Sequence, residues 1–185
     1  VLREAASKRA DLAGIGFEGF LSVNISAYQL RHPEFMDLVR QVIRRNKIEP
    51  GWLHFELTET SLMATEGIAM EVLQQLRELG ITLAIDDFGK GYSSLTYLRH
   101  RPVEMLKIDR SFIMGVVDSA EDCSIIRSVC ALAESLGLKV VAEGVETDAH
   151  FLSVQESRCD AFQGYLFSRP VAYGEFIDVL RKKVP

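Results

Sequence analysis

Short apolar runs rich in β-branched residues alternate along this chain with longer segments of helical periodicity. Six of these runs are expected to be strands, at residues 20–25, 53–58, 81–86, 105–108, 139–143 and 161–165. Alternation of this kind is typical of βα units built around a parallel sheet. With 185 residues, 48% of them hydrophobic, the chain can bury one sizeable core, so we expect a single domain over residues 1–185.

The segments between these runs carry start and stop signals for helices. Amphipathic helices are expected at residues 35–43 with Pro33 in the first turn, at residues 70–79 closed by Gly80, between Ser119 and Gly137, and after a cap at Thr147. A last helix is expected from Tyr173 to Lys182. The chain therefore reads as α/β throughout.

Two architectures accommodate repeated βα units. A (βα)8 barrel of about 250 residues uses roughly 30 residues per unit. Six strands in 185 residues then fit a TIM-like barrel with about six βα units present. The opening segment from Val1 to Ala6 reads as helix without a capping residue, so we expect the remaining strands to precede it. A doubly wound open sheet is the alternative, although no Gly-x-Gly-x-x-Gly follows the first strand.

Charge and cysteine content narrow the classes of function. The net charge of -5 and the pI near 5.4 argue against a protein that holds a nucleic acid polymer on a broad basic surface. The three cysteines are an odd number without metal-ligand spacing, so neither a disulfide framework nor a zinc site is indicated. A cytoplasmic setting is expected, with membrane attachment of a longer parent protein left open.

Each expected strand ends in a polar side chain. These residues are Asn24, Glu56, Asp86 with Asp87, Lys107, Glu143 and Gln163. In a parallel barrel the carboxyl ends of the strands converge on one face, where active sites are built. The carboxylates and the amide of Asn24 make an oxygen-rich set suited to Mg²⁺, Mn²⁺ or Ca²⁺. Singly, each residue also has a structural role available, such as a carboxylate pairing with an arginine.

Asp86 and Asp87 lie next to each other at the mouth of a buried strand. Two adjacent carboxylates repel each other and lose solvation there, so a cation should compensate them. Because strand side chains alternate, both can face one site only if the strand yields to the loop at Asp87, which Gly89 would permit. Asp86 could then bridge two cations about 3.5 to 4 Å apart, as in phosphodiester hydrolysis. Lys107 would position a water and stabilise phosphate charge, or deprotonate the water if its pKa were lowered.

Six sequence motifs together resemble the EAL-domain family. They are Val-Asn-Ile-Ser, Glu-Leu-Thr-Glu-Thr, Asp-Asp-Phe-Gly-Lys-Gly-Tyr-Ser-Ser-Leu, Leu-Lys-Ile-Asp, Ala-Glu-Gly-Val-Glu-Thr and Gln-Gly-Tyr-Leu-Phe-Ser-Arg-Pro. The match runs in order from the first residues to the last helix. This family comprises bacterial phosphodiesterases that linearise cyclic di-GMP to pGpG, so the resemblance implies that activity in second-messenger signalling.

The resemblance also implies roles for individual residues. Asn24, Glu56 and Asp86 would bind one Mg²⁺ or Mn²⁺ ion, and Asp86, Asp87 and Glu143 a second, with Ca²⁺ acting as an inhibitor. Lys107 would hold or activate the hydrolytic water, and Gln163 would orient water or phosphate. These assignments make cyclic di-GMP the expected ligand.

A loop after Asp87 is implied to couple the metal site to dimerisation. Glu59 resembles the acid that anchors this loop, whose skeleton is Gly89, Gly91, Ser93 and Ser94. Lys90 stands where the family often has a small polar residue, a departure that the intact skeleton should tolerate. A homodimer is expected, together with a sensor or GGDEF domain upstream in the parent protein. Glu146 is expected to support the site in a role left unassigned.

One departure from the family pattern is serious. The Glu-Ala-Leu signature, whose glutamate is a metal ligand, should precede Val1, and Glu4-Ala5 continues into Ala6 instead. Loss of a metal-binding carboxylate and of two strands should weaken metal binding and leave this chain with little turnover. The alternative to an enzyme is a non-catalytic module that binds cyclic di-GMP and passes the signal to a partner.

Overall fold

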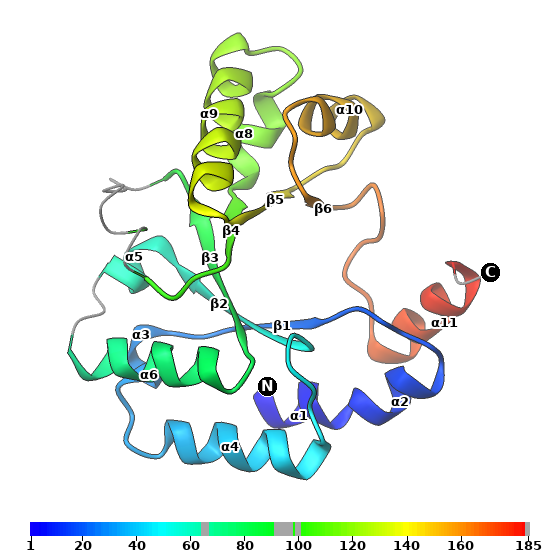
Figure 1. Cartoon of the computed structure of the whole chain (residues 1–185). Coiled ribbons are helices and arrows are strands. Elements are labelled where there is room, and N and C mark those ends of the chain that lie inside the picture. The colour runs from blue at the N-terminus through cyan, green and yellow to red at the C-terminus, as the bar shows by residue number, and fades with distance from the viewer. Residues whose placement is uncertain (64–66, 91–97, 99–100, 184–185) are drawn as a thin grey trace.

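The structure is a computed structural model that describes residues 1–63, 67–90, 98 and 101–183. Six parallel strands form one sheet in which each strand pairs with the next along the chain, and together they make a half-barrel with helices around it (Figure 1). The strands are β1 (Leu21–Asn24), β2 (Leu53–Thr58), β3 (Thr82–Phe88), β4 (Met105–Ile108), β5 (Lys139–Glu143) and β6 (Ala161–Gln163). The strand order does not reverse, which distinguishes this sheet from a doubly wound one.

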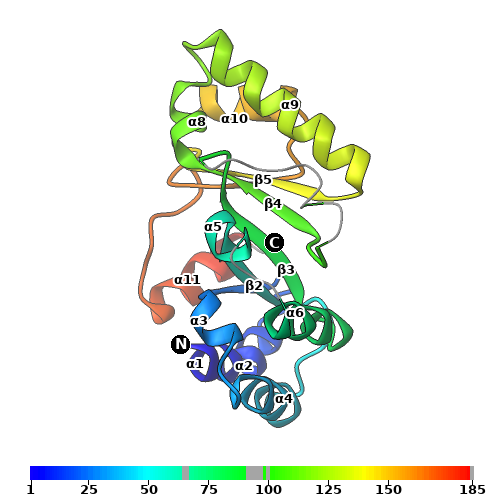
Figure 2. The ribbon, with the colours of Figure 1, turned by 90° about the vertical axis from the view of Figure 1, so that its left-hand side faces the viewer.

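The helices alternate with these strands. They are α1 (Leu2–Ser7), α2 (Arg9–Gly14), α3 (Ala27–Leu30), α4 (Phe35–Asn46), α5 (Glu59–Met63), α6 (Ile68–Glu78), α8 (Arg110–Gly115), α9 (Ala120–Leu136), α10 (Asp148–Glu156) and α11 (Tyr173–Lys183). A view turned by 90° shows α8, α9 and α10 near β5, at one end of the sheet, and α4 and α6 near the other end (Figure 2). None of the helices in the described part of the chain is long and apolar enough to cross a membrane.

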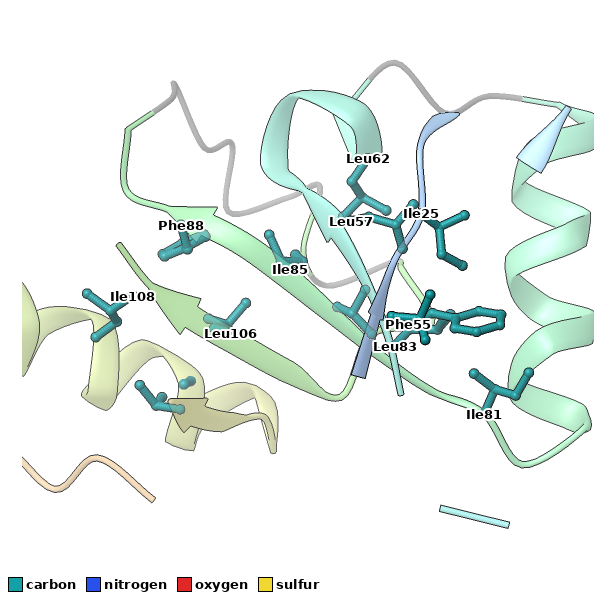
Figure 3. Close-up of a cluster of buried hydrophobic side chains, with 14 of the residues drawn as sticks. Ile25, Phe55, Leu57, Leu62, Ile81, Leu83, Ile85, Phe88, Leu106 and Ile108 are labelled. Atoms are coloured by element: carbon teal, nitrogen blue, oxygen red, sulfur yellow. The ribbon is translucent and has the colours of Figure 1, made fainter. Parts of the chain in front are cut away.

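The core sits on the face of the sheet that the helices cover. Leu53, Phe55 and Leu57 of β2 are fully buried there, and they alternate with His54 and Glu56 on the opposite face. The same alternation in β3 and β4 places Leu83, Ile85, Leu106 and Ile108 in the cluster with Leu62 of α5 (Figure 3). Burial of each such side chain contributes roughly 1.5 to 3 kcal/mol, and a one-residue slip would expose them all. The core therefore fixes which side chains face the other way.

The expected boundaries of three strands match those of the structure, and three differ. The strands at 53–58, 105–108 and 139–143 are confirmed, whereas β1 and β6 are shorter than expected. The prediction that β3 ends at Asp86 was wrong, because pairing resumes at Phe88 after an irregularity. Pro33 does not lie in the first turn of α4, because that helix begins at Phe35.

The helix caps at Ser119 and Thr147 are confirmed. The Ser119 hydroxyl accepts a hydrogen bond from the backbone N–H of Asp122, and the Thr147 hydroxyl accepts one from that of His150. Gly137 ends α9 in the left-handed conformation with φ of 70°. Each hydroxyl accepts a hydrogen bond from a backbone N–H that has no partner within the first turn of the helix, which stabilises the helix by about 1 kcal/mol.

Candidate active site

A buried lysine lies among three carboxylates on the face of the sheet opposite the core. Nζ of Lys107 lies 2.8 Å from Oε2 of Glu56, 3.3 Å from Oδ1 of Asp86 and 2.6 Å from Oε1 of Glu143. The Lys107 side chain is 5% exposed, and the three acids are no more than 17% exposed. The four residues come from four neighbouring strands, β2 to β5. We call this group the Lys107 cluster.

The Lys107 cluster carries more negative than positive charge. Burial alone would lower the pKa of Lys107, but hydrogen bonds with Glu143 and Glu56 outweigh it and raise this pKa, so the side chain is an ammonium. The pKa of Glu143 is raised because burial disfavours its charge and Asp86 and Glu56 repel it, against the attraction of Lys107. One ammonium therefore contacts three carboxyl groups, which outnumber it. A further cation would relieve this imbalance.

A β-bulge brings both aspartates of the Asp86-Asp87 pair opposite Lys107. Ile85 pairs with Leu106 and Phe88 pairs with Ile108, so two residues of β3 face the single residue between them on β4. Asp87 adopts φ of 56°, in the left-handed region, which interrupts the alternation of side chains. The sequence led us to expect that the alternation breaks where the strand yields to a loop at Asp87. The break lies within the strand, however, and not in a loop released by Gly89.

A second lysine links Asp87 to Asp109. Nζ of Lys90 lies 3.0 Å from Oδ1 of Asp87 and 2.8 Å from Oδ2 of Asp109. Asp109 also caps α8, accepting hydrogen bonds from the backbone N–H and the hydroxyl of Ser111. Burial would raise the pKa of Asp109, but the bonds from Lys90 and Ser111 lower it. We call Asp87, Lys90 and Asp109 the Lys90 cluster.

Sequence reasoning assigned no role to Asp109. The sequence nevertheless contained a signal for a helix start, because Asp109 follows an apolar run and aspartate is a preferred N-cap residue. In the structure its side chain accepts a hydrogen bond from the backbone N–H of Ser111, two residues later. The short helix α8 that it caps was not predicted either. Lys90, a departure that the loop was expected to tolerate, instead makes the charge contacts that join the bulge to this cap.

Asn24 and Gln163 lie at the ends of the two outer strands. Asn24 pairs in register with Glu56, and Gln163 with Glu143. Both side chains are exposed, and they flank the Lys107 cluster without joining its ion pairs among the described residues. The sheet thus brings Glu56, Asp86, Lys107 and Glu143 into contact and sets the two amides beside them.

The residues expected to anchor the loop are described in part. The buried carboxylate of Glu59 accepts a hydrogen bond of 3.3 Å from the backbone N–H of Gly89. Gly89 adopts φ of 104°, and a Cβ there would meet the ring of Phe112 at 2.8 Å. Gly91, Ser93 and Ser94 lie outside the described residues. Glu146 pairs with Arg110 of α8 at 2.8 Å.

The donors of this site suit a hard divalent cation. Carboxylate and amide oxygens are the ligands that Mg²⁺ and Mn²⁺ prefer, and each acid of the Lys107 cluster has a second oxygen besides the one on Nζ. Within the described part of the chain, no three Asp, Glu, His or Cys side chains already converge on a metal position. The acids converge on Nζ of Lys107 instead.

Comparison with known families identifies the family of this chain. The family model for the EAL domain matches residues 1–170. The chain belongs to the EAL domain family. Its relatives include the cyclic di-GMP phosphodiesterases NbdA and RocR of Pseudomonas aeruginosa, with 42% and 36% identity over 98% and 95% of this chain. This EAL domain chain spans 23% of the length of NbdA and 45% of that of RocR.

Solved EAL structures have the same fold. The EAL domain of Mycobacterium smegmatis DcpA matches with a TM-score of 0.90 and 36% identity, over 100% of this chain and 84% of that one. The cyclic di-GMP complex of the PaMucR phosphodiesterase matches with a TM-score of 0.88 and 39% identity, over 95% and 71%. BlrP1 of Klebsiella pneumoniae, in a complex with manganese and cyclic di-GMP, matches with a TM-score of 0.80 and 32% identity, over 91% and 44%.

Proposed function

We propose that this EAL domain serves a protein that hydrolyses cyclic di-GMP to linear pGpG with the help of two divalent cations, Mg²⁺ or Mn²⁺. The observation that carries the proposal is the Lys107 cluster, in which three acids on three strands exceed the charge of one buried lysine. It lies towards the carboxyl ends of the parallel strands, where barrel enzymes build their sites. The names of NbdA and RocR support the same substrate.

The cations are assigned by donor chemistry and register. Asn24, Glu56 and Asp86 would hold one ion, and Asp86, Asp87 and Glu143 the other, because the bulge sets both aspartates opposite Lys107. When bound, such ions neutralise phosphate charge and lower the pKa of a water. Ca²⁺ has the same ligand preference with looser geometry, so we propose it as an inhibitor that fills the site.

The chain's own residues then have separate tasks. Lys107 contacts all three acids of the cluster, so its part would be to hold a water or a phosphate oxygen by donating a hydrogen bond. Gln163, exposed beside Glu143, would donate its amide N–H to phosphate or water. Lys90 holds Asp87 in place, and Glu59 holds the backbone at Gly89, where we propose that the loop links the site to a homodimer.

Asp86→Asn tests the proposal, because it removes the carboxylate assigned to both ions and keeps the shape of the side chain. The matched control is Glu104→Gln, which removes a carboxylate from a surface pair with Arg77. With Mn²⁺, the rate of cyclic di-GMP hydrolysis should fall at least about 100-fold in Asp86→Asn, because substitution of residues that only hydrogen-bond to metal ligands already lowers activity or metal affinity 10- to 100-fold. The rate should stay unchanged in Glu104→Gln.

The assay compares this chain with a form extended upstream of Val1. We expect the extended form to turn over cyclic di-GMP and this chain to be much slower. Equal hydrolysis by the wild type and Asp86→Asn, both in the extended form, would contradict the metal assignment. Calorimetric binding of cyclic di-GMP by both lengths without formation of pGpG would favour the alternative, a non-catalytic binding module.

A further inference from the structure

Two buried cysteines outside the Lys107 cluster contact each other. Sγ of Cys130, in α9, lies 3.6 Å from Sγ of Cys159, which follows α10 and precedes β6. Both side chains are free thiols and less than a tenth exposed. The contact joins an outer helix to the segment that leads into the strand bearing Gln163. No task proposed for the active site uses this pair.

We propose that Cys130 and Cys159 form a reversible disulfide when the domain meets a hydroperoxide. Sulfur atoms in a disulfide are about 2.05 Å apart, so the two atoms must approach by about 1.5 Å. Rotation of the two side chains with a small shift of the turn after α10 supplies that movement. The third cysteine, Cys123, lies seven residues before Cys130 on the same helix and is not part of the pair.

A pocket gives the oxidant access to Cys130. Its volume is about 560 Å³, and Cys130 is among its lining residues whereas Cys159 is not. Three cationic side chains, Arg127, Lys139 and Arg158, and three acidic ones, Glu134, Glu156 and Asp160, also line it. The pKa of Cys130 is lowered by its hydrogen bond with the Cys159 thiol, against the effect of burial. Cys130 is therefore the attacking thiol and Cys159 the resolving one.

The reaction balances in two steps. The Cys130 thiolate attacks one oxygen of the hydroperoxide, so that an S–O bond forms, the O–O bond breaks and hydroxide or alkoxide leaves with the proton that Cys130 gave up. The Cys159 sulfur then attacks the sulfenic sulfur, an S–S bond forms, and the hydroxyl leaves as water with the Cys159 proton. Two thiols are oxidised and the peroxide bond is reduced. A dithiol reductant reverses the change.

The bond would close a loop that contains β5 and α10, and β5 carries Glu143. Crosslinking a loop of this length restricts the unfolded chain and should raise the Tm of the oxidised domain by roughly 5 to 10 °C. The shift should vanish after reduction with dithiothreitol.

The test treats the intact wild-type chain with hydrogen peroxide, blocks remaining thiols with iodoacetamide and maps peptides without reduction. We expect a peptide pair linked through Cys130 and Cys159, with Cys123 alkylated. Cys123→Ser is the matched control and should form the same link. In Cys159→Ser, dimedone should label Cys130 as a sulfenic acid.

Full alkylation of Cys130 and Cys159 after peroxide would overturn the proposal, as would their oxidation to sulfinic acids without a linked peptide. Should Cys159→Ser fail to fold, the peptide map of the wild type decides alone, because it requires no variant. A Tm that is unchanged in protein shown to be linked would contradict the stabilising role of the loop.

Discussion

Each of two lysines in this EAL domain is held by carboxylates, but in different surroundings. Lys107 is 5% exposed and contacts acids from three strands, whereas Lys90 is 54% exposed and contacts an acid three residues away and a helix cap. Water screens charges at an exposed lysine, and a buried lysine has only its partners. Both lysines pair with carboxylates, but Lys107 connects strands of the sheet and Lys90 connects a turn to a helix cap. Removing the buried lysine should therefore cost more stability than removing the exposed one.

Lys107→Met should have the largest effect of the changes at the two lysines. It leaves three buried carboxylates without their ammonium, and breaking a buried pair in this way costs about 3 to 5 kcal/mol. Guanidinium denaturation at neutral pH measures the loss. Added Mn²⁺ should restore part of it by compensating the acids. A variant as stable as the wild type in the absence of metal would show that the acids of the Lys107 cluster are not charged together.

Asp109→Asn should have an intermediate effect. Asparagine still caps α8, so the loss of about 1 kcal/mol reports the charge contacts with Lys90 and Ser111. The folded-state pKa of Asp109 is lowered from its ordinary 3.8, so its contribution is present above pH 3.8 and is lost as the pH falls towards the folded value. The stability difference between variant and wild type should therefore shrink in acid. Urea denaturation across this range measures it, and a difference that grows on acidification would contradict the assignment.

Lys90→Met should have the smallest effect. The Lys90 ammonium is half-exposed, so water screens it at both carboxylates, and pairs of such a lysine contribute between 0 and about 1 kcal/mol. The same denaturation experiment measures this variant beside Lys107→Met. A loss for Lys90→Met as large as that for Lys107→Met would break the comparison, because exposure would then not decide the cost of removing a lysine.

The two clusters also differ in how far the sequence predicts them. Strand-end positions of Glu56, Asp86, Lys107 and Glu143 follow from apolar runs and from the convergence of parallel strands. Their mutual contacts do not, because distances between side chains on different strands depend on register and curvature. The acids were predicted as metal ligands, and their contacts with Nζ of Lys107 were not predicted.

The Lys90 cluster could be predicted less well. Its geometry depends on a single extra residue in β3 and on the positive φ of Asp87, and neither leaves a mark in a pattern of hydrophobic residues. Short helices such as α5 and α8 could not be predicted for a similar reason, because so few residues do not establish a helical period of apolar side chains. The long helices α4 and α9 show several turns of their apolar stripe and were recognised.

The Lys107 cluster has a consequence for the order in which this domain acquires its structure. On the ribosome, Glu56 and Asp86 emerge before Lys107, and Glu143 emerges last. During synthesis the early acids can be solvated or can repel each other, but they have no internal partner until β4 has been made. Contacts between residues so distant in sequence form slowly. The Lys107 cluster can therefore be complete only after β5 has been synthesised, and until then a nascent chain holds these strands without their full set of partners.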